Sequence, residues 1–357
     1  MRLERYSRQI QLKSFGAAAQ EKLCKAKVLV VGAGGLGVPV LTYLNAMGVG
    51  ELGIVDNDVV SISNLHRQVL YEEKDVGQPK VAVAKKKLKA QNSETKITLF
   101  NTYLSSDNAL EIIKDFDCVV DASDNFPTRY LVNDACVILQ KPFVYGALHG
   151  FEGQVSVFNT TTGPTYRCLF PTMPKEGMIP NCSENGVLGI LPGIVGNLQA
   201  LETVKLITGI GALLSGTLLI FDALVQQTQK IQFSLIEENK KIKHLQSSYH
   251  FDCSTHLSSI GAQELQHLMQ EQKIQLVDVR TLEEFHQGHV LAALHIPLQE
   301  LQDRVEELDP AKAIYFICQS GMRSKKAIQR MDTLLPNAVC IQVIGGMNSL
   351  SALANFA

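Results

Sequence analysis

A glycine-rich turn near the start of the chain has the residue types of a site for nucleotide phosphates. Gly32, Gly34, Gly35 and Gly37 follow a short apolar run and open a helical one. Glycines in such a turn let phosphate oxygens approach the backbone N–H groups at a helix N-terminus. Asp56 ends the next apolar run, where an acid can hold a ribose hydroxyl. By itself this pattern favours a nicotinamide-dependent dehydrogenase, and it does not separate NAD from ATP.

Polar and charged side chains after Asp56 separate the two nucleotides. They are Asp58, Asn64, Arg67, Gln68 and Lys80. A hydride-transfer enzyme has no need for so many cationic and amide groups beside its cofactor. An enzyme that promotes attack at the α-phosphorus of ATP does need them, because Arg and Lys neutralise the charge that builds on the phosphates. The set therefore favours an adenylyltransferase.

Asp124 is the candidate ligand for Mg²⁺. It follows the apolar run Cys118–Ala122, at the carboxyl edge of the expected sheet, where open α/β sheets bind their ligands. A carboxylate there suits Mg²⁺ held jointly with ATP phosphates. Asp124 is also explained as the N-cap of a helix that begins near Phe126. Likewise, Arg67 or Lys80 alone is explained as a solvated surface charge, so the prediction rests on the whole set.

A second candidate reactive group is the thiol of Cys318. This cysteine follows an apolar run, and the next residues lead into a helix near Ser324. Inward-pointing N–H groups of such a loop and the helix N-terminus stabilise an anionic sulfur, and Arg323 adds a cation. Asp278 and Arg280 are expected to brace the loop, with a simple surface ion pair as the alternative.

The elements that must position these residues alternate between strand and helix in the first half. Strands are expected at Ala26–Gly32, Glu51–Asp56, Lys96–Leu104, Cys118–Ala122 and Pro142–Gly146, and helices at Val38–Met47, Lys80–Gln91 and Pro127–Gln140. This order predicts a doubly wound, mostly parallel α/β sheet. A more antiparallel part, with strands at Gly153–Asn159 and Leu218–Asp222, encloses a long polar loop, Pro164–Asn185, and the helix Leu191–Gly209.

A second, smaller α/β unit follows. Strands are expected at Ile274–Val279, Ala313–Cys318 and Val339–Ile344, with helical stretches at Leu282–Gly288 and Arg323–Leu335. The predicted domains are residues 1–240 and 257–357, with a polar linker at 241–256. A chain of 357 residues suits two such domains.

Composition narrows the class of protein. Hydrophobic residues make up 46% and charged residues 19%, which indicates globular domains. With 33 basic and 35 acidic residues, the chain has neither a nucleic-acid footprint nor a polybasic membrane anchor. The N-terminus lacks an apolar signal-peptide core, and no apolar run is long enough for a membrane span. We therefore expect a cytoplasmic protein, whose eight cysteines do not form a disulfide framework.

Several motifs of the first domain resemble the ubiquitin-activating-type superfamily. They are R-Y-x-R-Q at Arg5–Gln9, G-x-G-G-L-G, N-L-x-R-Q at Asn64–Gln68, G-Q-P-K ending at Lys80, and D-x-x-D-N at Asp121–Asn125. More closely, they resemble the molybdopterin-synthase and thiamine sulfur-carrier adenylyltransferases, over residues 5 to about 230. The resemblance implies that Arg8, Asn64, Arg67, Gln68, Lys80 and Asp124 serve ATP and acyl-adenylation. It also implies a homodimer in which Arg8 reaches the partner subunit's site, and a ubiquitin-like carrier ending in Gly-Gly.

The C-terminal domain resembles rhodaneses over roughly residues 257–357. The matching segments are Leu276–Arg280, Glu283–Phe285, Gly288–Val290, His295–Pro297 and Cys318–Ser324. The resemblance implies an active sulfurtransferase loaded by a persulfide donor such as a cysteine desulfurase. A regulatory or partner-binding module is the alternative. The Gly-Gly-x-x-x-Trp motif of the family reads Gly345–Leu350 here, so its aromatic residue is missing.

The cysteines before the C-terminal domain have two candidate roles, as zinc ligands and as a reactive thiol. Relatives usually hold a structural Zn²⁺ with two C-x-x-C pairs, but the matching positions here offer only Cys168, Cys253 and His256. A closed structural site needs four ligands, so a lost site is favoured over bound zinc. Cys182 lies in the long loop, where the resemblance implies a covalent bond to the carrier or receipt of sulfur. A non-essential exposed thiol is the equal alternative.

These expectations combine into one hypothesis. ATP and Mg²⁺ bind at the glycine turn, the carrier's terminal carboxylate is adenylated, and a persulfide on Cys318, directly or through Cys182, displaces AMP. Reduction then yields a carrier thiocarboxylate. Two rival classes are a nicotinamide oxidoreductase with a regulatory domain and a non-catalytic scaffold for ubiquitin-like partners.

Overall fold

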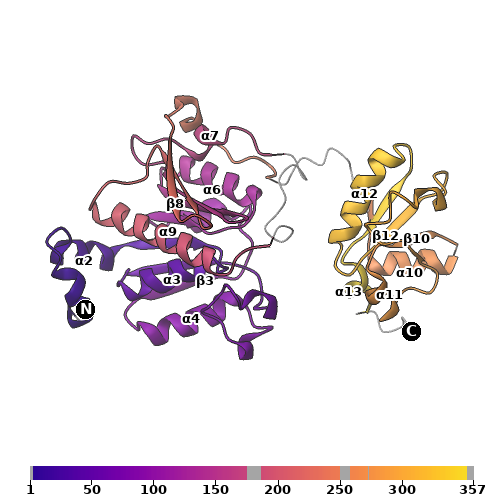
Figure 1. The fold of residues 1–357 in the computed structure, drawn as a ribbon, viewed down its shortest axis with the longest axis horizontal. Helices are drawn as coiled ribbons and strands as arrows, with labels where there is room; N and C mark the ends of the chain where they lie inside the picture. Colours follow the sequence, from indigo (N-terminus) through magenta and orange to yellow (C-terminus); the bar gives the residue numbers. More distant parts are fainter. Residues whose placement is uncertain (1–2, 175–185, 250–257, 272, 352–357) are drawn as a thin grey trace. The chain divides into compact units, whose positions relative to one another are not determined.

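A computed structural model describes residues 3–174, 186–249, 258–271 and 273–351 of the chain (Figure 1). The chain divides into two compact units, Met1–Asp252 and Cys253–Ala357. Each unit is built around its own sheet and is described separately below.

The sheet of the first unit has eight strands in the order β3-β2-β1-β4-β5-β6-β7-β8. Their bounds are β1 Lys27–Val31, β2 Glu51–Val55, β3 Lys96–Phe100, β4 Cys118–Asp121, β5 Phe143–His149, β6 Glu152–Phe158, β7 Thr217–Asp222 and β8 Gln227–Gln232. Strands β1 to β5 pair in parallel, and β5 to β8 pair antiparallel. The predicted doubly wound, mostly parallel sheet is confirmed.

Helices cover both faces of this sheet (Figure 1). They are α1 Ser7–Ile10, α2 Gly16–Lys25, α3 Gly37–Ala46, α4 Lys80–Gln91, α5 Ala109–Ile113, α6 Phe126–Ile138, α7 Tyr166–Leu169 and α9 Ile190–Thr208. None of the helices in the described ranges combines the length and apolarity that a bilayer crossing needs.

The central strands are apolar at successive residues because both of their faces are buried. Side chains alternate across a strand, so Val28 and Val30 of β1 pack on the face covered by α3 and α9. Leu29 and Val31 point to the opposite face, toward α5 and α6. The two apolar layers fix β1 between β2 and β4, and thereby fix the glycine turn that follows it.

The structure departs from the sequence predictions at several places. Strand β3 ends at Phe100 rather than at Leu104, and the edge strand β8, which is polar and exposed, was not predicted. Helix α2 was not predicted either. The residue that caps α6 is Asn125, whose side chain accepts a hydrogen bond from the N–H of Thr128 at 2.9 Å. The interpretation of Asp124 as the N-cap is therefore wrong.

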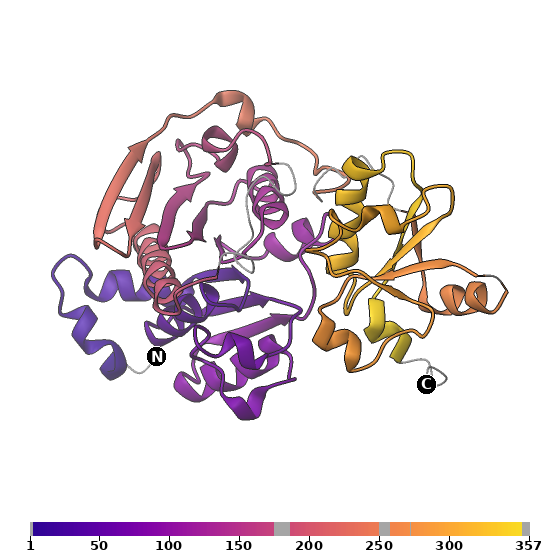
Figure 2. The same ribbon diagram turned by 45° about the vertical axis from the view of Figure 1, so that its right-hand side comes forward.

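The second unit holds a parallel five-stranded sheet in the order β11-β10-β12-β13-β9. Its strands are β9 Ser258–Ile260, β10 Gln275–Asp278, β11 Leu294–His295, β12 Ile314–Ile317 and β13 Cys340–Val343, and its helices are α10 Ala262–Glu271, α11 Leu282–His286, α12 Met322–Leu334 and α13 Gly346–Ser351. Helix α12 packs with one face of the sheet, and α10 and α13 pack with the other (Figure 2). A smaller α/β unit was predicted here and is confirmed.

Candidate functional site

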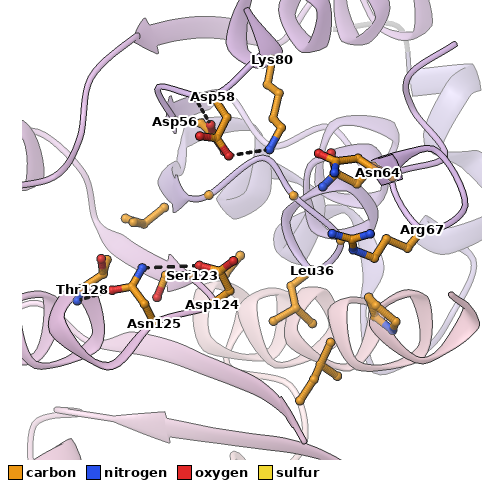
Figure 3. Close-up of a pocket in the computed structure, with 18 of the residues that line it drawn as sticks. Leu36, Asp56, Asp58, Asn64, Arg67, Lys80, Ser123, Asp124, Asn125 and Thr128 are labelled. Carbon is orange, nitrogen blue, oxygen red and sulfur yellow. Dashed lines mark hydrogen bonds and ion pairs between the residues drawn. The ribbon is translucent and has the colours of Figure 1, made fainter. Parts of the chain in front are cut away.

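A pocket of about 870 Å³ lies at the carboxyl ends of β1, β2 and β4, where the sequence placed the nucleotide. Nine of the predicted site residues line it: Gly34, Gly35, Asp56, Asp58, Asn64, Arg67, Gln68, Lys80 and Asp124. In Figure 3, Lys80, Arg67 and Asp124 approach the pocket from three sides. Gly37 and Arg8 do not line it.

The glycine turn leaves no room for side chains at two positions. Gly32 has a φ of 99°, and a Cβ there would lie 2.7 Å from the carbonyl oxygen of Ala122. A Cβ on Gly37 would overlap the carbonyl oxygen of Gly32. Gly37 therefore packs α3 against the turn rather than facing a ligand, which explains why it does not line the pocket. The hydroxyl of Tyr71 donates a hydrogen bond to the carbonyl of Ala33 at 2.8 Å, which fixes the backbone of the turn.

Asp56 and Lys80 form the end of the pocket beyond β2. The carboxylate of Asp56 accepts the N–H of Ala33 at 2.7 Å and the N–H of Asp58 at 2.8 Å, so it joins the glycine turn to its own loop. Burial raises the pKa of Asp56, against the attraction of Lys80 and the two N–H groups. The Lys80 side chain is buried, and its Nζ donates to Asp58 at 2.8 Å. The alternative of a solvated surface charge at Lys80 is wrong, because the side chain is buried. Its ammonium group is paired with Asp58, as a buried charge requires.

Arg67 is held in place by its own loop. Its Nη1 donates to the carbonyl of Ser63 at 3.0 Å and lies 2.8 Å from Nε2 of His66. Gln68 is buried, and its Oε1 has no hydrogen-bond partner among the described residues. An unpaired buried amide oxygen that lines a pocket is expected to meet a donor on a ligand.

The turn after β4 forms the opposite wall. The carboxylate of Asp121 is fully buried and accepts from the N–H and hydroxyl of Ser123 at 3.1 and 2.6 Å. Burial raises the pKa of Asp121, opposed by the charge of Arg129. Arg129 donates to the carbonyl of Ser123 at 3.3 Å and lies over the ring of Tyr145. These groups fix the backbone on either side of Asp124, which is exposed to the pocket and receives only a 3.4 Å contact from Asn125.

The predicted site residues did not include Arg129 or several other residues that line the pocket, although Ser123 and Asn125 lie within the D-x-x-D-N motif. Besides Arg129, they are Asn57, Ser63, His66, Thr102, Tyr103, Leu104, Ser123, Asn125, Thr128, Leu148, Gly186, Val187 and Pro192. Thr102–Leu104 reach the pocket because β3 ends early. A signal for Arg129 existed, since it lies one helical turn after Asn125, but its burial depends on the rings that it meets in the fold.

The N-terminal motif has a structural part and an exposed part. The hydroxyl of Tyr6 is buried and accepts from the side chain of Asn92 at 3.1 Å, and the amide of Gln9 donates to the carbonyl of Met47 at 3.2 Å. The first contact holds this segment against the end of α4, and the second holds α1 against the end of α3. Arg8, between them, is exposed and lies outside the pocket of its own subunit.

In the second unit, Cys318 follows β12 and its loop encloses the thiol. Cys318 is 1% exposed; its Sγ accepts the N–H of Gly321 at 3.1 Å and lies 3.7 Å from the hydroxyl of Ser324. Gly321 has a φ of 97°, which turns that N–H inward. A cavity of about 730 Å³ lies beside the loop and is lined by Gln319 and by Leu350, the residue that replaces the usual aromatic.

Two ion pairs hold the loop of Cys318. Arg280 and Asp278 are both buried and joined by hydrogen bonds of 2.8 to 3.0 Å, and Arg280 also donates to Gln319 at 3.1 Å. The alternative of a surface ion pair is wrong here, since Arg280 contacts the residue after Cys318. Arg323 donates to both carboxylate oxygens of Glu284 at 2.5 and 2.7 Å, so its charge is shared with α11.

The Glu284 pair gives a prediction for stability. The hydrogen bond from Arg323 lowers the pKa of Glu284 to about 2, from an ordinary value of 4.5. Because the pKa of Glu284 is lower in the folded state than in the unfolded state, the pair stabilises the folded state fully above pH 4.5. This contribution is lost as the pH falls toward 2. Because the pair is partly exposed, we expect Glu284→Gln to lower the free energy of unfolding of this unit by about 1–2 kcal/mol at pH 7.

Urea titrations of the intact chain at pH 7 and pH 3 measure this effect, with the second unit followed through hydrogen exchange in α12. The difference between wild type and Glu284→Gln should shrink at the lower pH. A Glu283→Gln variant, altered at the neighbouring exposed position, is the control and should change little. An equal difference at both values of pH would contradict the assignment.

Of the three predicted zinc ligands, Cys168 lies within the described residues. Cys253, His256 and Cys182 lie outside the described residues. Sγ of Cys168 accepts hydrogen bonds from the N–H of Ile236 at 3.3 Å and the side chain of Asn239 at 3.5 Å. Burial opposes ionisation, but these bonds and one from Thr165 lower the pKa of the Cys168 thiol. Within the described ranges, no three side chains of His, Cys, Asp or Glu come together as a metal site.

Both units are similar to known protein families. Residues 6–242 match the ThiF family, and residues 261–352 match the rhodanese-like domain. The chain is 55% identical over 234 residues to "Sulfur carrier protein adenylyltransferase" of Thermus thermophilus, covering 64% of this chain and 86% of that protein. It is 38% identical to "Adenylyltransferase and sulfurtransferase MOCS3" of Arabidopsis thaliana, covering 98% of this chain and 84% of the relative.

Solved structures share the fold of the first unit. A structure of E. coli MccB with ATP is 25% identical, with a TM-score of 0.57, and covers 65% of this chain and 72% of its own. Another, of MccB with MccA-N7isoASN, is 23% identical with a TM-score of 0.59, covers 66% of this chain and 73% of its own, and is similar in fold alone.

Proposed function

Because this chain belongs to the ThiF family and has a rhodanese-like domain after it, we propose that it adenylates a sulfur-carrier protein and then transfers sulfur to it. The carrier is a ubiquitin-like protein with a C-terminal Gly-Gly. The observation that carries the proposal is the convergence of Lys80, Arg67 and Asp124 on one pocket beside the glycine turn. A nicotinamide oxidoreductase and a non-catalytic scaffold account for these groups less well, because neither needs two cations and a carboxylate around a triphosphate.

In the first step, a carboxylate oxygen of the carrier attacks the α-phosphorus of ATP. The new bond makes an acyl-adenylate, the bond between the α-phosphorus and the bridging oxygen breaks, and pyrophosphate leaves. Charge grows on the phosphate oxygens during this step, and Arg67 and Lys80 stabilise it. The hydrogen bond to Ser63 holds Arg67 in place before ATP binds. Lys80 replaces its ion pair with Asp58 by one with a phosphate oxygen of ATP. Asp56 accepts from the ribose, and Asn64 and Gln68 orient the nucleotide.

Asp124 is the protein ligand that we propose for Mg²⁺. Its carboxylate is exposed to the pocket and is only weakly engaged by Asn125, which fits a hard cation that prefers oxygen ligands. When bound, the ion would neutralise phosphate charge. No step of the proposal uses zinc, because the sequence offers three of the four ligands that a closed structural site needs, Cys168, Cys253 and His256. Exposed Arg8 would complete the site of the partner subunit in a cytoplasmic homodimer.

The second step takes place on Cys318. A persulfide donor, such as a cysteine desulfurase, leaves sulfane sulfur on this thiol. The outer sulfur then attacks the acyl carbon and expels AMP, which joins the carrier to Cys318 through an acyl disulfide. A reducing thiol pair breaks the S–S bond, is itself oxidised to a disulfide, and releases the carrier thiocarboxylate. Cys182 is proposed as the alternative acceptor in this sequence. The product would serve molybdopterin, thiamine or a related sulfur pathway.

ATP–pyrophosphate exchange tests the first step. Incubation of the whole chain with ATP, Mg²⁺, labelled pyrophosphate and a purified Gly-Gly carrier should return label into ATP. A carrier that lacks its last two residues is the matched control and should give none. The absence of exchange with every Gly-Gly carrier of the host would count against the proposed function.

A further inference from the structure

Three exposed apolar side chains lie on two neighbouring turns at the carboxyl edge of the first sheet. Phe151, in the turn between β5 and β6, is 47% exposed, and Leu224 and Val225, in the turn between β7 and β8, are 69% and 60% exposed. We refer to these three residues as the turn patch. The N–H of Ala223 donates to the carbonyl of Phe151 at 3.0 Å, so the two turns are in direct contact.

The turn patch is close to the mouth of the nucleotide pocket. Leu148, near the end of β5, lines the pocket, and it pairs across the sheet with Gly153, which pairs in turn with Phe221 next to the second turn. Two steps between strands cover about 10 Å. An extended tail of about five residues spans roughly 17 Å. A carrier with its terminal carboxylate in the pocket therefore keeps its folded body within reach of the turn patch.

The charges beside the turn patch define the kind of partner. Glu152 and Asp222 are directly opposite each other in the β6–β7 register. Like charges in this position are unfavourable. The carboxylate of Asp222 accepts the N–H groups of Leu224 at 2.8 Å and Val225 at 3.4 Å, whereas Glu152 makes no ion pair with any described residue. A cationic side chain of a partner would relieve the repulsion.

From this geometry we infer that the turn patch is the docking surface for the folded body of the carrier. The carrier contacts it through an apolar patch of its own, which has a Lys or Arg at its edge. The inference rests on the proposed function and deepens it. Docking outside the pocket separates two tasks: the turn patch sets the affinity for the carrier, and the pocket carries out the chemistry. Burial of apolar side chains in a small interface places most of the binding energy on a few residues.

Leu224→Ser and Phe151→Ser are expected to raise the KM for the carrier in the exchange assay on the order of 10-fold each. Neither variant should change the KM for ATP or the rate at saturating carrier. Glu152→Lys should raise the same KM and weaken its dependence on salt. Val76→Ser, an exposed apolar residue in the connection between β2 and α4, is the matched control and should behave as wild type.

A synthetic peptide with the carrier's last six residues provides the second arm. It needs only the pocket, so wild type and Leu224→Ser should use it with the same KM. An unchanged carrier KM in the Leu224→Ser and Phe151→Ser variants overturns the docking inference. A difference in oligomeric state between these variants and wild type, measured by sedimentation, also overturns it, because it would assign the turn patch to a second copy of the chain. No exchange by wild type with carrier or peptide would instead count against the proposed function.

Discussion

Arg67→Ala is expected to lower the rate of ATP–pyrophosphate exchange at saturating substrate by roughly 10²–10³-fold. The reason is that Arg67 enters the pocket already held by Ser63 and His66, so its charge meets the transferring phosphate at no cost of reorganisation. Because the charge grows only in the transition state, kcat should fall more than the affinity for ATP. Steady-state exchange and equilibrium ATP binding, measured on the same preparations, separate the two effects.

The control for this experiment is Lys86→Ala. Lys86 is an exposed cation on α4, the same helix that begins with Lys80, and its removal changes the net charge by the same amount. We expect exchange within about twofold of wild type, as is usual for surface substitutions. A loss in Lys86→Ala comparable to that in Arg67→Ala would show that net charge, rather than a placed guanidinium, is what matters.

Cys318→Ser is expected to abolish thiocarboxylate formation, by on the order of 10³-fold or more, while pyrophosphate exchange stays at the wild-type rate. Serine fits the loop but its oxygen cannot carry sulfane sulfur. The product carrier is measured by its mass, which rises when sulfur replaces oxygen, and exchange is measured in parallel. This variant also tests the alternative in which the rhodanese-like domain only regulates or binds partners.

Cys340→Ser is the matched control for that experiment. Cys340 lies in β13 of the same unit and is only partly buried, so the substitution removes a thiol without touching the loop of Cys318. Sulfur transfer should persist. If Cys318→Ser formed thiocarboxylate as fast as Cys340→Ser, the domain would not be the source of the sulfur.

Much of the fold could be predicted because local patterns and tertiary packing agree. The apolar runs of β1 and β4 are continuous, and such strands have few solutions other than a sheet buried on both faces. Lys80 begins α4 as the sequence predicted. The glycine turn could be predicted in part from local sequence, since Gly32 has a backbone conformation that other residues rarely adopt, but the packing role of Gly37 depends on tertiary contacts.

What could not be predicted depends on distant contacts. The polar strand β8 forms because β7 supplies a pairing edge, and its sequence has no alternation that would identify it. Arg129 is buried because Phe126 and Tyr145 lie beside its guanidinium, at 5.3 and 5.5 Å from the ring centroids. Leu148 reaches the pocket only because β5 runs past its neighbour β4. None of these facts is encoded at short range.

The burial of Cys318 has a consequence for how the protein survives oxidants. A bare thiol that is 1% exposed meets peroxide or an alkylating agent rarely, so the empty enzyme is protected from the irreversible sulfinic and sulfonic states. Loading adds a second sulfur about 2 Å beyond Sγ. The vulnerable atom is then the expendable outer one, and reductive removal of that sulfur would regenerate an intact cysteine.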